Sequence, residues 1–424
     1  MKQEIKNRIE KINNGIVPEG YKKTDFGIVP LYWEKYSISD ISIGNGQYGL
    51  NAPACAFNSK LPKYIRITDI DDEGRYIDTG ACVKQYDCDN YVLSENDIVF
   101  ARTGASVGKN YLYNKKDGIL AFAGFLIRYK LNKEIVNSYL VKRNCTTKYY
   151  DRWVKMMSAR SGQPGINAEE YSKYAFYIPK DLKEQESIAK ILMKWDEMVE
   201  LQENYIEKLE IRKKSLMQQL LTGKQRLPGF TGEWENCKLK KYLQEETKRN
   251  ASSNINNVLS VSNKLGFISQ LQQFEQSIAS ADTSNYKVVS IGCIAYNPSR
   301  INVGSIAYYD CKESGIVSPM YVVFRTNKNL NAEYFMQIIR THTFNEKIKI
   351  MLSGSVRDSL NFNDLCELTF TIPPLEEQKA IADILSKADE EIELNKQKLE
   401  KIKEQRKTLQ QYLLMGIVRV KLDA

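Results

Sequence analysis

A long internal repeat constrains the architecture of this chain more than any other feature of its 424 residues. Residues 184–224 align without a gap with residues 377–417, so that Gln185 meets Gln378 at an offset of 193 positions. Shorter matches upstream pair Trp33-Glu34 with Trp234-Glu235, Val107-Gly108 with Val303-Gly304, Ser161-Gly162 with Ser353-Gly354, Ile166-Asn167 with Leu360-Asn361, and Tyr177-Ile178-Pro179 with Thr371-Ile372-Pro373. Because self-similarity of this kind indicates repeated structural units, the chain is predicted to hold two copies of one unit.

The two repeated segments are predicted to be long helices that pack on each other. Their seam positions follow alternating spacings of four and three. These positions are Ile188, Leu192, Trp195, Val199, Gln202, Ile206, Leu209, Lys213, Leu216 and Leu220 in the first segment, and Ile381, Leu385, Ala388, Ile392, Asn395, Leu399, Ile402, Arg406, Leu409 and Leu413 in the second. A period of about 3.5 residues kept over this length is typical of coiled coils. Each helix would run about 38 residues, or about 57 Å. Two helices in separate bundles are the less favoured interpretation.

The segments between the helices are rich in β-branched and aromatic residues and are interrupted by Gly, Asn and Asp turns, as in 63–70, 97–102, 118–129, 290–296 and 315–325. We therefore expect an α+β protein with two mixed, β-rich domains. Two long helices forming an antiparallel coiled coil would join them in a pseudo-two-fold repeat. The expected boundaries are an N-terminal helical extension at 1–20, a first β-rich domain at 21–180, a central helix at 181–223, a second β-rich domain at 224–373, a distal helix at 374–416 and a C-terminal tail at 417–424.

Composition argues against several classes of chemistry. His342 is the only histidine, so a His-based triad, a His-rich metal site and a histidine general base are not expected. The eight cysteines form no C-x-x-C pair and are expected to be reduced thiols. The longest apolar run, 119–127, is too short to cross a membrane, and the charged N-terminus lacks the apolar stretch of a signal peptide. We expect a cytoplasmic protein whose net charge of +9 is compatible with a polyanionic partner.

Three segments imitate catalytic motifs without meeting their requirements. Residues 104–110 look like a phosphate-binding loop, but only three residues separate the glycines and Asn110 replaces the Ser or Thr. Residues 296–299 imitate the loop of adenine methyltransferases but lack its second proline and its aromatic residue. The acidic residues at 69–73 are better explained as a polar turn before Gly74 than as a metal site. We therefore expect no metal, nucleotide or methyl-donor cofactor bound by this chain.

Two similar modules held at a fixed spacing suit a long polymer with a repeating geometry. A two-fold axis perpendicular to a helix pair makes the pair antiparallel and places one module at each end, facing the same side. Dimeric DNA-binding proteins use such spacing to contact two half-sites. Because the two modules differ in sequence, we expect an asymmetric, split DNA target with an unread spacer whose length the helices set.

Short segments along nearly the whole chain match one family in their joint order. They are 24–34 (TDFGIVPLYWE), 63–71 (KYIRITDID), 95–109 (ENDIVFARTGASVGK), 161–167 (SGQPGIN), 286–307, 314–319 (SGIVSP), 353–361 (SGSVRDSLN) and the two IP…EQ…IA…IL helices. On these segments the chain resembles the specificity subunit of type I restriction–modification systems. The resemblance implies a non-catalytic subunit with two target-recognition domains that bind double-stranded DNA. It also implies two modification subunits that methylate adenine N6 and two motor-nuclease restriction subunits, with S-adenosylmethionine, ATP and Mg²⁺ used by those partners and no membrane involved.

Polar residues in turn and strand segments are the candidates for DNA contact, because Arg and Lys pair with phosphates or guanine and Asn pairs with adenine. The first set is Arg102, Thr103, Ser106 and Lys109, with Arg300 and Asn302 in the second half. The second set is Arg160, Gln163 and Asn167, with Ser355, Arg357 and Asn361. The weaker candidates are Lys63, Tyr64, Arg66, Asn263, Lys264 and Gln270. For the recurrent Gly and Asn positions we favour a structural role in the turn.

The exposed faces of the long helices are candidates for contact with methyltransferase subunits, with a solvated charged face as the alternative. The residues concerned are Glu203, Tyr205, Glu207, Lys396 and Lys398. A coiled-coil scaffold that does not read DNA is the alternative function for the whole chain, and an enzyme complete in itself is a third. The missing cofactor motifs oppose the enzyme, and two non-identical β-rich modules oppose a simple scaffold.

Overall fold

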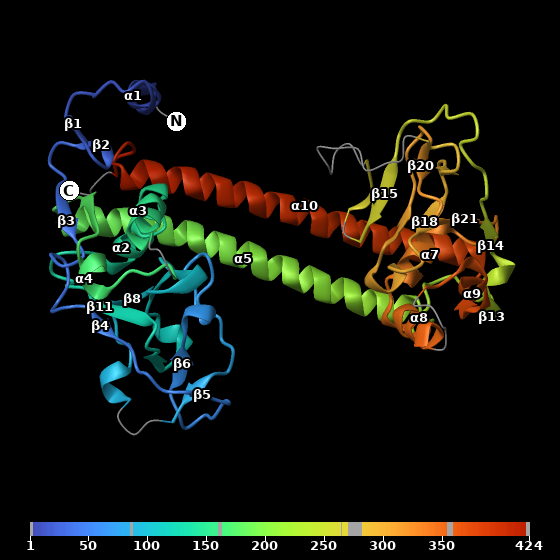
Figure 1. The fold of residues 1–424 in the computed structure, drawn as a ribbon, viewed down its shortest axis with the longest axis horizontal. Coiled ribbons are helices and arrows are strands. Elements are labelled where there is room, and N and C mark those ends of the chain that lie inside the picture. The colour runs from blue at the N-terminus through green and yellow to red at the C-terminus, as the bar shows by residue number, and fades with distance from the viewer. Residues whose placement is uncertain are drawn as a thin grey trace. The chain divides into compact units, whose positions relative to one another are not determined.

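The computed structural model describes residues 3–84, 88–159, 163–263, 265–269, 282–353 and 359–420. The chain divides into two compact units, shown with their elements in Figure 1. Unit 1 comprises residues 1–201 and 399–424, and unit 2 comprises residues 202–398. Helices α5 (Leu182–Leu220) and α10 (Leu375–Leu414) each contribute one part to each unit.

Unit 1 is built around two four-stranded sheets, with the strand orders β10-β6-β7-β5 and β4-β11-β8-β9. Their strands are β4 (Gln47–Tyr48), β5 (Ala54–Cys55), β6 (Lys63–Ile65), β7 (Cys82–Val83), β8 (Asp97–Ala101), β9 (Asn110–Leu112), β10 (Leu120–Phe122) and β11 (Leu126–Lys130). Two shorter antiparallel pairs are β1 (Tyr21–Thr24) with β2 (Gly27–Pro30), and β3 (Glu34–Ser37) with β12 (Ala175–Ile178). The β-branched and aromatic runs of the sequence therefore form the expected strands.

The core of unit 1 lies where its second sheet meets the helices. Strand β8 lies between β11 and β9, and all of its residues are buried. Helices α2 (Ser138–Asn144), α3 (Lys148–Ser158) and α4 (Ala168–Ser172) contribute to the same apolar cluster as Ile188 and Leu192 of α5 and Leu413 of α10. The β-rich domain of this unit is thus packed directly on the helix pair.

Unit 2 repeats the central part of this topology. Its four-stranded sheet has the order β14-β21-β18-β19, which matches β4-β11-β8-β9 strand for strand. The strands are β13 (Glu235–Lys238), β14 (Leu243–Glu245), β15 (Leu259–Ser262), β16 (Gly266–Ser269), β17 (Lys287–Val289), β18 (Ile294–Tyr296), β19 (Ile306–Tyr308), β20 (Gly315–Val317), β21 (Val322–Thr326) and β22 (Thr369–Ile372). The pair β13–β22 corresponds to β3–β12 of unit 1. The sequence repeat is therefore also a repeat of the fold.

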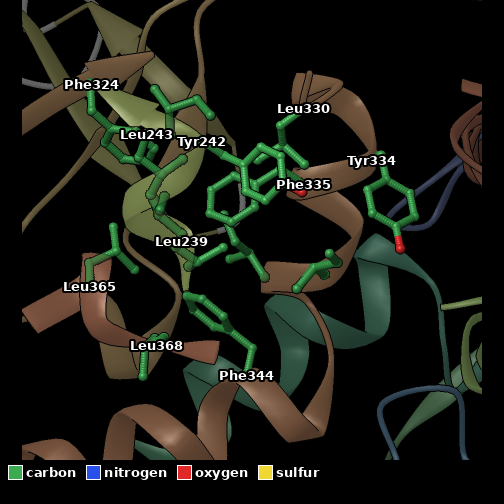
Figure 2. Packing of buried hydrophobic residues seen from close by; sticks show 14 of the residues in the cluster. Leu239, Tyr242, Leu243, Phe324, Leu330, Tyr334, Phe335, Phe344, Leu365 and Leu368 are labelled. Atoms are coloured by element: carbon green, nitrogen blue, oxygen red, sulfur yellow. The ribbon is translucent and has the colours of Figure 1, made fainter. Parts of the chain in front are cut away.

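Helices α7 (Ala332–Ile339), α8 (His342–Ser353) and α9 (Phe362–Glu367) close the core of unit 2. Figure 2 shows Phe335 and Phe344 directed toward Leu239 and Tyr242, with Leu365 and Leu368 alongside. Burying an apolar side chain of this size contributes about 1.5–3 kcal/mol. This cluster also includes Leu220 of α5 and Leu385 of α10, so the second domain is packed on its part of the helix pair.

The two long helices run antiparallel within each unit. In unit 1, Arg406 of α10 donates to Asp196 of α5 at 2.9 Å. In unit 2, Gln202 donates to Asn395 at 3.0 Å, and Lys213 pairs with Asp389. The predicted seam positions are buried or half-buried along both helices, which confirms the heptad spacing. Together with the repeated β-rich domains, this helix pair confirms the predicted fold class.

The ends of both long helices are defined by equivalent glycines. Gly223 and Gly416 follow α5 and α10 with φ angles of +70° and +66°, which a side chain would disfavour. A short helix, α1 (Gln3–Asn13), precedes the first domain, and its Arg8 donates to the carbonyl of Ile417 at 2.9 Å. In the described residues, no helix is long and apolar enough to cross a membrane.

Candidate nucleic-acid interface

The two predicted contact turns of the first half lie against each other in unit 1. The loop at 102–109 leaves β8 and enters β9, and Gly104 forms part of a short 3-10 turn. The Gly104 amide donates to the Pro164 carbonyl at 3.0 Å, and the Ile166 amide donates to the Arg102 carbonyl at 2.9 Å. The exposed Gln163 side chain also lies beside Gly104. The structure thus brings Arg102, Thr103, Ser106, Lys109 and Gln163 into one surface, which we call the unit 1 loop surface.

Arg102 is the most available cation of the unit 1 loop surface. Its guanidinium lies over the ring of Tyr48, with 4.9 Å to the centroid. The Tyr48 hydroxyl accepts from the Ala168 amide at 3.2 Å, which fixes the ring. Among the residues that the structure describes, none forms an ion pair or a side-chain hydrogen bond with the Arg102 guanidinium. The guanidinium is therefore oriented by an aromatic ring, and within the described residues its five donors have no side-chain acceptor.

Lys109, at the other end of the loop, has partners inside the protein. Its ammonium lies 2.8 Å from the Asp72 carboxylate and 3.2 Å from the Ile70 carbonyl. The ion pair lowers the pKa of Asp72, because the neighbouring ammonium stabilises the carboxylate. The Lys109 ammonium is therefore less available to an external acceptor than the Arg102 guanidinium.

The strand candidates of unit 1 are engaged in structural contacts. Lys63 pairs with Asp78 at 2.7 Å, and Arg66 grips the buried Asp69 with Nε at 2.8 Å and Nη2 at 3.0 Å. This charge-assisted contact raises the pKa of Arg66. Tyr64 is buried, and its hydroxyl donates to the carbonyl of Ala52 at 3.2 Å. These side chains are therefore engaged in contacts within the first domain, and their role in DNA contact stays a prediction.

The corresponding turn of unit 2 carries the same backbone bond. The Leu360 amide donates to the Pro298 carbonyl at 3.0 Å, as Ile166 does to Arg102 in unit 1. Arg300 and Asn302 are both exposed on this turn, and Asn263 lies beside Gly304 at its end. Within the described ranges, the Arg300 guanidinium has no partner. We call Asn263, Arg300 and Asn302 the unit 2 loop surface.

Four candidates, Arg160, Lys264, Ser355 and Arg357, lie outside the described residues, as does Gln270 among the weaker ones. The structural interpretation is confirmed for the recurrent asparagines. Asn167 caps α4 by accepting from the Glu170 amide at 2.9 Å, and Asn361 caps α9 by accepting from the Asp364 amide at 2.9 Å.

Two segments that imitate other motifs have ordinary structural roles. The turn at 104–106 is followed by strand β9, whereas a phosphate-binding loop leads into a helix. In the acidic segment, Asp69 binds Arg66, and Asp71 accepts from the amides of Glu73 at 2.9 Å and Arg75 at 2.8 Å. The polar-turn interpretation of residues 69–73 is therefore confirmed.

Sequence reasoning missed two aromatic residues that contact Arg102 of the unit 1 loop surface. Tyr48 supports Arg102, and Phe125 is 58% exposed while its carbonyl accepts from the Arg102 amide at 3.0 Å. Neither residue stands within a motif. The glycine-rich segment 44–49 was the available signal, because its glycines permit the close backbone approach of Gly49 to Ala123.

On the surfaces of the long helices, two predicted docking residues form contacts inside unit 2. Tyr205 donates to Glu391 at 3.3 Å, and Lys396 pairs with Glu210 at 2.7 Å. Glu207 and Lys398 are exposed, and Glu203 is half-buried. These residues stay candidates for partner contact.

Comparisons with known proteins agree with this arrangement. The model of the type I restriction modification DNA specificity domain matches residues 30–211 and 234–404. A Methanocaldococcus jannaschii sequence named as the type I restriction enzyme MjaX specificity subunit is 26% identical over 441 positions, covering 95% of this chain and 97% of that protein. The MjaVIII specificity subunit of the same organism is 24% identical over 438 positions, covering 96% and 99%.

Solved structures share the fold at low sequence identity. The type I restriction–modification S subunit from M. genitalium superposes with a TM-score of 0.57 at 13% identity, covering 90% of this chain and 96% of that one. A chain from a study of complex assembly and conformational transition of the type I R-M system gives 0.53 at 15% identity, covering 92% and 99%. The two matched segments span most of the sequence, one in each half of the repeat. The chain therefore belongs to the type I restriction–modification DNA specificity family and carries two copies of its domain.

Proposed function

We propose that this chain selects the DNA target of a type I restriction–modification complex and carries out no chemistry itself. Each unit reads one half of an asymmetric, split target. Phosphate contacts place the loop surfaces on the duplex, and base-edge contacts make the binding selective. Adenine-N6 methyl transfer belongs to two modification subunits and DNA cleavage to two restriction subunits. Those partners, acting with this chain in the cytoplasm, would hold S-adenosylmethionine, ATP and Mg²⁺.

One observation carries this proposal. The two units place equivalent turns with the same backbone bond, Ile166 to Arg102 and Leu360 to Pro298, but equip them with different side chains. Arg102 lies over Tyr48 in unit 1, whereas Arg300 and Asn302 are exposed in unit 2. Two turns with the same backbone structure but different exposed side chains suit a DNA target whose two halves differ in sequence.

The helix pair is proposed to set the spacer between the half-sites and to dock the modification subunits. The apolar seam residues of the two helices are buried or half-buried within the protein, so a docking partner would have to contact the outward faces of the helices. Glu207 and Lys398 are the exposed charged groups that support this part of the proposal.

The test is to express the chain with a partner adenine methyltransferase and to sequence the genome for N6-methyladenine. We expect a split, asymmetric methylated motif that is absent when the chain is omitted. Replacing residues 21–180 by those of a relative should change only one half of the motif. Methyladenine without a split motif would favour the scaffold alternative, and a change in both halves would contradict one domain reading one half-site.

A further inference from the structure

The turn at residues 71–75 joins the unit 1 loop surface to helix α10 through two adjacent carboxylates. Asp72 lies 2.8 Å from the ammonium of Lys109, at the end of the candidate DNA loop. Glu73, the next residue, lies 2.6 Å from the guanidinium of Arg406, which also binds Asp196 of α5 at 2.9 Å. Neighbouring residues of one turn therefore bind a recognition-loop cation and a cation of the helix pair.

Hydrogen bonds and close packing hold the backbone of this turn, so the backbone position of Asp72 is fixed. Asp71 accepts from the amides of Glu73 and Arg75 and binds the Arg75 side chain at 2.8 Å. Gly74 has a φ of +71°, and a Cβ there would stand 2.6 Å from the carbonyl oxygen of Asn110, the residue after Lys109. The turn is thus packed against the loop that carries Lys109, the partner of Asp72.

The Asp72–Lys109 pair adds little to stability and is easily exchanged. The Asp72 side chain is 94% exposed, and that of Lys109 is 30% exposed. Exposed ion pairs of this kind are weak and are screened by salt. A carboxylate and a phosphate oxygen offer an ammonium the same kind of acceptor, so a phosphate oxygen could replace Asp72 as the partner of Lys109.

We propose that Asp72 is a specificity-determining residue that competes with DNA phosphates for Lys109. This inference rests on the proposed DNA-reading function. On non-target DNA, Lys109 stays paired with Asp72 and contributes no phosphate contact. On the target, base contacts hold the loop in one place, and a phosphate in register with Lys109 displaces Asp72. The lysine then adds affinity mainly where the sequence is correct.

Unit 2 has no counterpart of the Asp72–Lys109 ion pair, because it lacks the lysine. The proposal therefore applies to unit 1 only. The repeat pairs Gly108 with Gly304 and therefore Lys109 with Ser305. Ser305 is buried, and its hydroxyl donates to the Val261 carbonyl at 3.0 Å. At the position equivalent to Lys109, unit 2 therefore has a serine and no ammonium with which an acidic residue could pair.

The experiment compares the full chain, purified with its methyltransferase partner, in four forms: wild type, Asp72→Asn, Lys109→Gln and the double variant. Binding to a fluorescein-labelled scrambled duplex of about 40 base pairs is measured as a function of KCl concentration. Asp25→Asn is the matched control, because it removes a half-exposed carboxylate that pairs with Lys35 at 2.6 Å. Lys109→Gln keeps a donor for the Ile70 carbonyl, and thermal unfolding checks that each variant is folded.

Asp72→Asn should bind the scrambled duplex about three- to tenfold more tightly at about 0.1 M salt, with a salt slope steeper by about 0.9. The gain should be smaller on a duplex carrying the methylated motif, and it should vanish in the Lys109→Gln background. A gain equal to that of Asp25→Asn, or one that persists without Lys109, overturns the role of Asp72. If the wild-type protein binds neither duplex, the proposed DNA-binding function itself fails. If the wild type binds DNA but Asp72→Asn shows no gain that depends on Lys109, only the role of Asp72 fails.

Discussion

Lys142 shows how the surroundings of one residue set its protonation. It lies in α2, and its Cε stands 3.4 Å from the place where a Cβ on Gly74 would be. Burial lowers the pKa of Lys142 to about 8, because the charged form loses hydration, and the neighbouring Arg143 adds repulsion. The unfolded chain, with an ordinary lysine pKa, binds more protons between that value and about 10.4. The free energy of unfolding should therefore rise with pH across this window.

Replacing Lys142 by Met should remove this penalty. We expect a gain of about 1–3 kcal/mol in the free energy of unfolding at neutral pH, and a smaller gain near pH 10, where the wild-type amine is mostly neutral. Thermal unfolding at the two pH values measures both gains. Lys133→Met, at a side chain that is 76% exposed, is the control and should change little. Equal gains in the two variants would show that burial of Lys142 is not the cause.

At the scale of the elements, Asp196 ties three helices of unit 1 together. It pairs with Arg406 of α10 at 2.9 Å and with Arg143 of α2 at 3.4 Å, and it accepts from the Tyr139 hydroxyl. Both arginines are buried. Removing the charge of Asp196 takes away the carboxylate that pairs with the buried Arg143 and leaves Arg406 with Glu73 alone. Leaving a buried cation uncompensated is more costly than losing an exposed pair.

Asp196→Asn should therefore destabilise unit 1 by about 2–4 kcal/mol. Glu197→Gln, the same chemical change at the exposed neighbouring residue, should stay within about 0.5 kcal/mol. Thermal unfolding of the full chain reports the overall effect, and hydrogen exchange of the α2 amides reports the local one. Similar effects from the two substitutions would mean that the buried ion cluster does not hold α2 on the helix pair.

The elements also show what the sequence could predict. The heptad spacing of Ile188 and Leu192 fixed which helix faces are buried, because periodicity is a local property. A structural role for Asn167 and Asn361 was predicted for the same local reason, and the structure shows that this role is to cap helices α4 and α9. Long-range pairings such as Gly104 with Pro164 were not predictable, since no local pattern specifies which loop meets which. The ion pair of Lys63 with Asp78 was hidden in the same way, because the fold brings the two residues together. The pair of Arg66 with Asp69 is local, across one 3-10 turn, and was overlooked although no long-range pairing is involved.

At the scale of the whole molecule, the two units share a fold but carry different loop surfaces. A substitution in one unit should therefore affect only one half of the DNA motif. Arg102→Met should change the preference at one or two positions in one half of the methylated motif, and Arg300→Met should act only on the other half. Each base contact of this kind is worth about 1–3 kcal/mol, so methylation of the relaxed sites should rise about tenfold or more relative to the full motif.

Each variant is the control of the other, because both remove one guanidinium from an equivalent turn. Sequencing of N6-methyladenine in cells that carry each variant reads both halves at once. If an arginine contacts only phosphate, its loss lowers methylation evenly and leaves the motif unchanged, since phosphates carry no base information. If either substitution relaxed both halves, the units would not read separately. If each substitution instead relaxes the base preference in a different half of the motif, each loop surface is linked to its own half-site.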